Sequence, residues 1–116
     1  TRPWIEQSPV ANKIDFRIGD AAKEAPKLGI TFDMAFVDGD KRTYAEVYEK
    51  LLPIIRPGGY ILADNTLWDW HVIDPAYDHD HQTIGIRQFN DLIAKDERVE
   101  KVILPLRDGL TLIRKK

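Results

Sequence analysis

The segment that decides the fold is Phe32-Asp-Met-Ala-Phe-Val-Asp-Gly-Asp-Lys41. Five of the seven residues from Phe32 to Asp38 are apolar, a composition typical of a parallel strand that is covered on both faces. The segment then ends abruptly in two carboxylates and a lysine, Asp38, Asp40 and Lys41. Because ligands bind just beyond the carboxyl ends of strands in open α/β sheets, we expect these side chains at a functional site.

A second segment, Gly59-Tyr-Ile-Leu-Ala-Asp-Asn65, repeats this design with Asp64 and Asn65 at its end. Neighbouring parallel strands lie ~4.8 Å apart, so the two strand ends are expected to form one site. The oxygen atoms of Asp38, Asp64 and Asn65 suit a divalent cation, Mg²⁺ first and then Mn²⁺ or Ca²⁺. Lys41 is a candidate general base if burial or the cation lowers its pKa. From the residues alone, solvated polar side chains at strand-to-helix turns are an equal alternative.

The rest of the pattern predicts an α/β sheet that is parallel except for a terminal hairpin. The Asp-Gly pair at 108–109 favours that hairpin, with Arg107 and Asp108 as turn residues or as part of an acceptor pocket. The expected elements are strand Ile14–Ile18, helix Ala21–Leu28, strand Phe32–Asp38, a helix opened by the capping box Thr43–Glu46, strand Tyr60–Asp64, loop Thr66–Gln82, helix Thr83–Lys95, and strands Val99–Leu106 and Leu110–Arg114. The apolar stripe of the second helix is expected to be core: Tyr44, Val47, Tyr48, Leu51 and Ile55.

The composition indicates one globular domain. The chain has 116 residues, of which 43% are hydrophobic and 31% charged. A net charge of −2 argues against tight nucleic-acid binding, and the absence of cysteine excludes disulfides, thiolate zinc sites and cysteine nucleophiles. No apolar stretch approaches the ~20 residues of a membrane helix and no signal peptide opens the chain, so we expect a cytoplasmic protein without membrane contact.

The predicted loop contains a dense polar patch formed by His71, Asp78, His79, Asp80 and His81. Histidine and carboxylate side chains at such density are compatible with a transition-metal site. A mobile, solvated loop is the plainer interpretation, because loops of this length inside compact domains are usually functional or disordered.

Five segments in order add a more specific signal. They are Phe32-Asp-Met-Ala-Phe-Val-Asp-Gly-Asp-Lys-Arg-Thr-Tyr44, Leu52-Pro-Ile-Ile-Arg-Pro-Gly-Gly59, Ala63-Asp-Asn-Thr-Leu-Trp68, Ile86-Arg-Gln-Phe-Asn90 and Leu104-Pro-Leu-Arg-Asp-Gly-Leu110. With these segments, the chain from about Val10 to Lys115 resembles the C-terminal part of the cation-dependent, S-adenosylmethionine-dependent O-methyltransferases. That group contains the catechol and caffeoyl-CoA O-methyltransferases. The resemblance implies one truncated domain, residues 1–116, with a partial Rossmann-like sheet and a C-terminal antiparallel hairpin.

The resemblance also implies a reaction. Asp38, Asp64 and Asn65 match the family's metal ligands, and Lys41 matches its catalytic lysine. The metal, most simply Mg²⁺, would bind two oxygens of a catechol or phenolic acceptor and lower the pKa of one hydroxyl group. Lys41 would take that proton, and the oxyanion would attack the sulfonium methyl group in line.

Cofactor and acceptor positions follow from the same resemblance. The residues matched to S-adenosylmethionine contacts are Asp20, Ala21, Asp38 and Asp40. Trp68 and Trp70 would wall the aromatic acceptor. The bulky run Asp69-Trp70-His71 departs from the family, which has a small residue there, so the identity of the acceptor stays open.

A larger departure concerns the cofactor half of the family fold. The family's glycine-rich loop and the acidic residue that binds the ribose have no counterpart in residues 1–13. The family sheet has the strand order 3-2-1-4-5-7-6, and without strands 1 and 2 the strand Ile14–Ile18 lacks a neighbour. One edge of the Phe32–Asp38 strand would be bare. We therefore expect that the chain pairs with another copy as a homo-oligomer, most simply a dimer, or rearranges, or is part of a longer polypeptide. We also expect poor binding of S-adenosylmethionine by this chain alone.

Three alternative functions are open at this point. The pair Asp38-x-Asp40 after an apolar strand also resembles the haloacid dehalogenase phosphatases, although Arg42 stands where that motif usually has Thr or Val. A hydroxylated tRNA uridine is an alternative methyl acceptor, against which the net charge argues. The third alternative is an inactive fragment that only self-associates.

Overall fold

Four strands form one sheet with the order β1-β2-β4-β3. In the computed structural model, which describes residues 1–116, the strands are β1 (Phe32–Val37), β2 (Ile55–Asp64), β3 (Val99–Leu104) and β4 (Leu110–Lys115). β1 and β2 are parallel, and β4 runs antiparallel to both β2 and β3. The α/β class and the terminal antiparallel hairpin are therefore confirmed.

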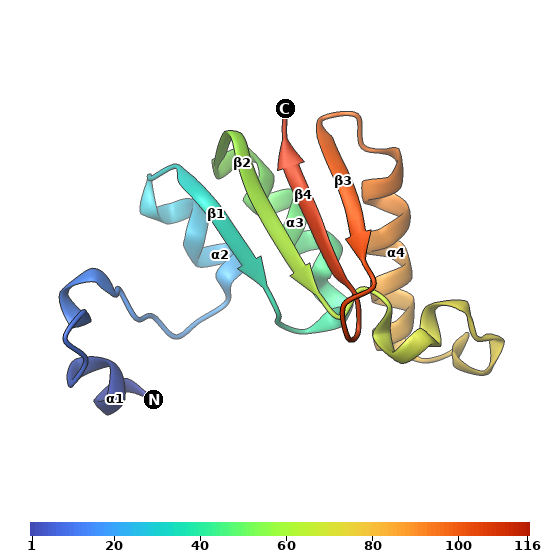
Figure 1. Ribbon diagram of the computed structural model, residues 1–116, viewed down its shortest axis with the longest axis horizontal. Coiled ribbons are helices and arrows are strands. Elements are labelled where there is room, and N and C mark those ends of the chain that lie inside the picture. The colour runs from blue at the N-terminus through green and yellow to red at the C-terminus, as the bar shows by residue number, and fades with distance from the viewer.

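Three helices cover one face of this sheet (Figure 1). They are α2 (Ala21–Glu24), which continues as a 3₁₀ turn to Leu28, α3 (Tyr44–Leu51) and α4 (His81–Lys95). Tyr44 and Tyr48 of α3 pack edge-to-face on Phe89 of α4, with ring centroids 5.5 and 5.9 Å apart. These rings meet Ile61 and Ile113 of the sheet in one hydrophobic core. None of the helices is long and apolar enough to span a membrane.

The opposite face of the sheet is bare. The strand register places Phe36, Leu62, Leu112 and Val102 in one row across all four strands. Phe36 is 58% exposed and Val102 is 53% exposed, while Leu62 and Leu112 between them are half-buried, so this apolar row reaches solvent with no helix over it. The prediction that the strand Phe32–Asp38, now β1, is covered on both faces is thus wrong, because α2, α3 and α4 all lie on the same side of the sheet.

The N-terminal arm also departs from expectation. Residues 14–18 form no strand, because no neighbouring strand is available to pair with their backbone. The arm, which includes the short helix α1 (Arg2–Glu6), reaches away from the body of the molecule (Figure 1). The unpaired edge of β1 is consequently exposed beside it.

Two helix starts differ in detail from the prediction. The capping box does not form, because the Thr43 hydroxyl donates to the Asp40 carbonyl oxygen at 2.9 Å and closes the 3₁₀ turn Lys41–Thr43. α4 begins at His81, two residues earlier than expected, because the Asp80 carboxylate accepts from the Thr83 backbone N–H at 2.8 Å. Short 3₁₀ turns, Trp68–Ile73 and Pro75–Tyr77, occupy the predicted loop. Ile55 belongs to β2 rather than to the helical stripe.

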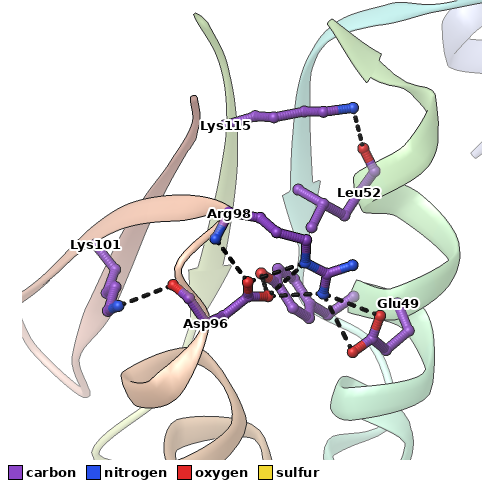
Figure 2. Close-up of polar contacts among 7 residues, drawn as sticks. Glu49, Leu52, Asp96, Arg98, Lys101 and Lys115 are labelled. Atoms are coloured by element: carbon purple, nitrogen blue, oxygen red, sulfur yellow. Dashed lines mark hydrogen bonds and ion pairs between the residues drawn. The ribbon is translucent and has the colours of Figure 1, made fainter. Parts of the chain in front are cut away.

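A buried carboxylate ties α3 to the turn between α4 and β3, as Figure 2 shows. Asp96 accepts from the Tyr48 hydroxyl at 2.6 Å and from the Arg98 Nη2 at 2.7 Å. Arg98 also contacts Glu49 on α3 at 3.2 Å. The Arg98 guanidinium holds the pKa of Asp96 well below its usual range, against the opposing effect of burial.

We predict that this carboxylate makes the fold sensitive to acid. A depressed pKa in the folded state gives stability that is present above the unfolded pKa of ~3.9 and is lost as the pH falls below it. Asp96→Asn should cost about 1–3 kcal/mol at neutral pH, and the difference from the wild type should shrink below about pH 4. Urea unfolding between pH 2 and 7 measures this, with the exposed Asp33→Asn as control. A difference in unfolding free energy between the wild type and Asp96→Asn that does not change with pH would contradict this prediction.

Candidate functional site

The Tyr44 hydroxyl group joins the carboxyl ends of β1 and β2. It lies 2.9 Å from the Asp64 carbonyl oxygen and 3.2 Å from the Val37 carbonyl oxygen, and it shares its proton between them. The ring is 1% exposed, and burial raises the pKa of Tyr44, so the hydroxyl group stays protonated. Helical spacing predicts Tyr44 only as a core residue. Its place three residues after Lys41, at the start of the helix, is the signal that points to the site.

Lys41 is buried in the same place. Its Nζ donates to the Tyr44 hydroxyl at 2.7 Å and to Asp38 Oδ1 at 2.9 Å. Burial favours the neutral amine, but these two hydrogen bonds outweigh it, so the pKa of Lys41 is raised. Burial alone therefore does not make Lys41 a base. Of the two causes expected to lower the pKa of Lys41, burial and a bound cation, only the cation is left.

Helix α4 presses on the turn that carries Lys41. A Cβ atom built on Gly85 would overlap the Lys41 carbonyl oxygen and would lie 2.6 Å from the Arg42 Cα. Only a residue without a side chain allows the helix and the Lys41–Thr43 turn to approach so closely. The backbone of α4 thus sets the depth of Lys41 in the site.

The end of β2 is held by the β3–β4 hairpin. The Asp64 Oδ1 accepts from the Asn65 backbone N–H at 2.8 Å. The Asn65 Nδ2 donates to the Asp108 Oδ2 at 3.2 Å, which turns the amide oxygen of Asn65 to the other side. Asp108 also accepts from the Asp69 backbone N–H. This hairpin residue, predicted as a turn or pocket residue, therefore orients a predicted metal ligand from 43 positions away.

The two predicted acceptor residues lie differently. The Trp68 ring is 5.9 Å from the Lys41 Nζ and packs against the core. Trp70 is 56% exposed and makes no such contact. The structure therefore brings Trp68, and not Trp70, to the lysine.

A cavity of about 670 Å³ opens beside the unpaired edge of β1 and is bordered by α2 and α3. Its walls include all four residues matched to the cofactor, Asp20, Ala21, Asp38 and Asp40. Asp20 caps α2 by accepting from the Ala22 backbone N–H at 3.0 Å. The Arg42 guanidinium and backbone hold the pKa of Asp40 at about 2, so that carboxylate is already engaged.

The donor set at the strand ends fits a hard cation by its chemistry, since it combines two carboxylates with one oriented amide. No group of three or more histidine, cysteine, aspartate or glutamate side chains is close enough to hold a metal ion. The histidine patch is therefore not assembled as a transition-metal site. Instead, the His71 ring stacks on Tyr77, with centroids 3.5 Å apart.

Comparison with known proteins covers the whole chain. Residues 1–116 match the family model described as O-methyltransferase. Tricin synthase 1 of Oryza sativa subsp. japonica is 37% identical over 98% of this chain and 51% of its own length. Caffeoyl-CoA O-methyltransferase of Mesembryanthemum crystallinum is 40% identical over 97% of this chain and 49% of its own length. The chain thus spans about half the length of these curated relatives.

Solved structures give the same picture. The Bacillus cereus O-methyltransferase in complex with SAH has a TM-score of 0.86 and 29% identity, over 99% of this chain and 56% of that one. The SAH-bound methyltransferase PaMTH1 of Podospora anserina has a TM-score of 0.86 and 27% identity, over 99% and 54%. The arrangement of strands and helices described above is therefore shared with these enzymes.

We predict that Gly85→Ala displaces the Lys41 turn. The added methyl group overlaps backbone atoms, which cannot rotate away as a flexible side chain can, so the cost should be about 1–3 kcal/mol of unfolding free energy. Gly39→Ala is the matched control, because a Cβ atom there meets nothing within 4 Å. Chemical denaturation measures both variants. Equal stabilities for the two alanine variants would contradict the close approach of α4.

Proposed function

Because the chain belongs to the O-methyltransferase family, we propose that it supplies the metal and acceptor side of an S-adenosylmethionine-dependent enzyme that methylates a hydroxyl group of a phenolic small molecule. The observation that carries this proposal is the Tyr44 hydroxyl group, which draws Lys41 and the ends of β1 and β2 into one site. The activity is proposed for a polypeptide that contains the complete domain.

The metal ligands of this proposal are Asp38, Asp64 and Asn65, and Mg²⁺ is the cation that their oxygen atoms suit first. When bound, such a cation supplies Lewis acidity that lowers the pKa of a hydroxyl group. Two details of the structure support the assignment. Asp108 binds the Asn65 amide nitrogen, which leaves the amide oxygen free of that contact, and the Asp38 side chain is 53% exposed.

Lys41 is the proposed base. Positive charge near Asp38 favours the neutral amine, because a like charge disfavours the ammonium form. Tyr44 then fixes the position of the amine, and the Lys41 Nζ accepts the proton of the acceptor hydroxyl group. S-adenosylmethionine, when bound, supplies the electrophilic methyl group. Two short hydrogen bonds, to Asp38 and to Tyr44, hold the Lys41 nitrogen in position before the reaction begins.

The cofactor side of the proposal is the cavity beside β1, where Asp20, Ala21, Asp38 and Asp40 meet. The solved structures of the related Bacillus cereus and Podospora anserina enzymes contain SAH, which supports a cofactor of this class. The Asp40 carboxylate is already bonded to Arg42, so Asp40 would contact the cofactor through one carboxylate oxygen or through its backbone.

The acceptor side is formed by Trp68, with Trp70 further along the same loop. The names of the relatives, tricin synthase and caffeoyl-CoA O-methyltransferase, support a phenolic acceptor. An electrostatic argument disfavours the tRNA acceptor, since the chain carries a net charge of −2. The bare sheet face and the free edge of β1 support self-association, most simply as a dimer.

We predict that Lys41→Met, in a polypeptide carrying the complete domain, lowers kcat for methylation of a catechol acceptor by about 10²-fold or more, because it removes the base. Lys50→Met, on the exposed side of α3, is the charge-matched control and should retain full activity. Activity should vanish with a chelator and return with Mg²⁺. Transfer of a labelled methyl group measures all of these. Undiminished turnover by Lys41→Met would refute the assignment.

We also predict that the 116-residue chain alone binds S-adenosylmethionine weakly, with a Kd above about 1 mM. Its cavity is open along the unpaired edge of β1, and no glycine-rich loop follows a strand to receive the cofactor. Isothermal titration calorimetry of this chain with S-adenosylmethionine and with S-adenosylhomocysteine tests it. Micromolar binding of either compound would contradict the prediction.

A further inference from the structure

The connection between β2 and α4 has an unusual backbone. Three consecutive residues lie in the left-handed region, Trp68 with φ 48°, Asp69 with φ 52° and Trp70 with φ 63°. Each such residue costs about 1–2 kcal/mol when it is not glycine. Trp68 packs against the core and the Asp69 backbone N–H donates to Asp108, but no residue of the 3₁₀ turns in this connection is fully buried.

Arg87 of α4 holds the part of the connection that follows these three residues. Its Nε donates to the Val72 carbonyl oxygen at 3.0 Å. Its Nη2 donates to the carbonyl oxygens of His71 at 3.1 Å and Asp74 at 3.0 Å. Its Nη1 donates to Asp78 Oδ1 at 2.8 Å. One guanidinium therefore gathers three backbone carbonyl groups and one carboxylate from the segment 71–78.

This arrangement differs from an ordinary surface ion pair. Only 28% of the Arg87 side chain is exposed, and three of its four partners are backbone groups that no charge change can remove. The planar guanidinium reaches them in several directions at once, whereas a lysine offers a single ammonium group. The carbonyl groups of a loop with so few buried side chains depend on these donors.

Asn90, three residues further along α4, holds the beginning of the same connection, the near part at Asn65 and Thr66. Its Nδ2 donates to the Thr66 carbonyl oxygen at 2.9 Å. Thr66 is itself buried and bonds through its hydroxyl group to the Thr111 hydroxyl at 2.8 Å. The near part, which carries Asn65, is thus fixed independently of the far part that Arg87 holds.

We propose that Arg87 is a positioning residue for acceptor recognition: it holds the segment 71–78 against α4 and so keeps the Trp68 side of the site closed around the acceptor. The inference rests on the proposed function for the identity of the ligand, and on the contacts of Arg87 for the mechanism. Because neither Arg87 nor any residue of segment 71–78 lines the cavity beside β1, the proposed effect is on the acceptor and not on the cofactor.

The first experiment needs no activity. Hydrogen exchange of the 116-residue chain follows the amides of Asp74, Tyr77 and Asp78, each of which donates within this segment. Arg87→Met should raise their exchange rates about tenfold or more, and Arg87→Lys should fail to restore them. Arg56→Met, which removes an exposed guanidinium bonded to Asp33, is the control and should change nothing there. Unchanged exchange in both Arg87 variants would overturn the proposal.

The second experiment separates positioning from general damage. In a polypeptide carrying the complete domain, Arg87→Lys should raise KM for a catechol acceptor several-fold and leave KM for S-adenosylmethionine unchanged. Equal rises in both KM values, or no rise in either, would overturn the proposal. Absence of methyl transfer in the wild type would refute the proposed function, while the exchange rates would still decide whether Arg87 holds the segment.

Discussion

The hydroxyl group of Tyr44 is the contact on which the site depends. It is buried between two parallel strand ends and receives a hydrogen bond from Lys41, so one atom links three separate pieces of backbone. The ring that carries it is fixed edge-to-face on Phe89, deep in the core. The packing of α3 on α4 therefore sets the position of the Tyr44 hydroxyl group between the strand ends. A change in that packing would also move Lys41.

Helix α4 serves as the common support for the parts of the site that come from loops. Its Gly85 lets the Lys41 turn approach, its Arg87 gathers the segment 71–78, and its Asn90 binds the Thr66 carbonyl oxygen. These residues lie within two turns of one helix, and Arg87 and Asn90, three positions apart, share a face of it. Placing them on a helix gives the loop backbone a defined position, which the proposed site requires.

Much of this could be predicted from the sequence, and the failures have physical causes. The placement of Asp38, Asp64 and Asn65 at neighbouring strand ends follows from polar residues at the ends of apolar strands, and their role as metal ligands stays a prediction. Coverage of both sheet faces was mispredicted, because the apolar pattern of one strand cannot tell on which side the helices lie. The role of Tyr44 was missed, since helical periodicity reports that a side chain is buried and not what its hydroxyl group touches.

Residues 14–18 also show that a local sequence pattern does not reveal which neighbours a segment has. Their alternating pattern favours a strand, yet a strand exists only when a neighbour accepts its hydrogen bonds. Likewise, the contact from Asp108 to Asn65 spans 43 positions and depends on the hairpin packing over the end of β2. Such long-range contacts are fixed by the fold as a whole, beyond the reach of local patterns.

The proposed cation site at the ends of β1 and β2 is tested most directly by paramagnetic broadening of amide NMR signals with Mn²⁺. We expect residues 38–41 and 64–67 to broaden together at the lowest Mn²⁺ concentrations, and Asp38→Asn or Asp64→Asn to abolish both effects at once. Broadening centred on the histidine segment 71–81, or on only one of the two strand ends, would contradict it.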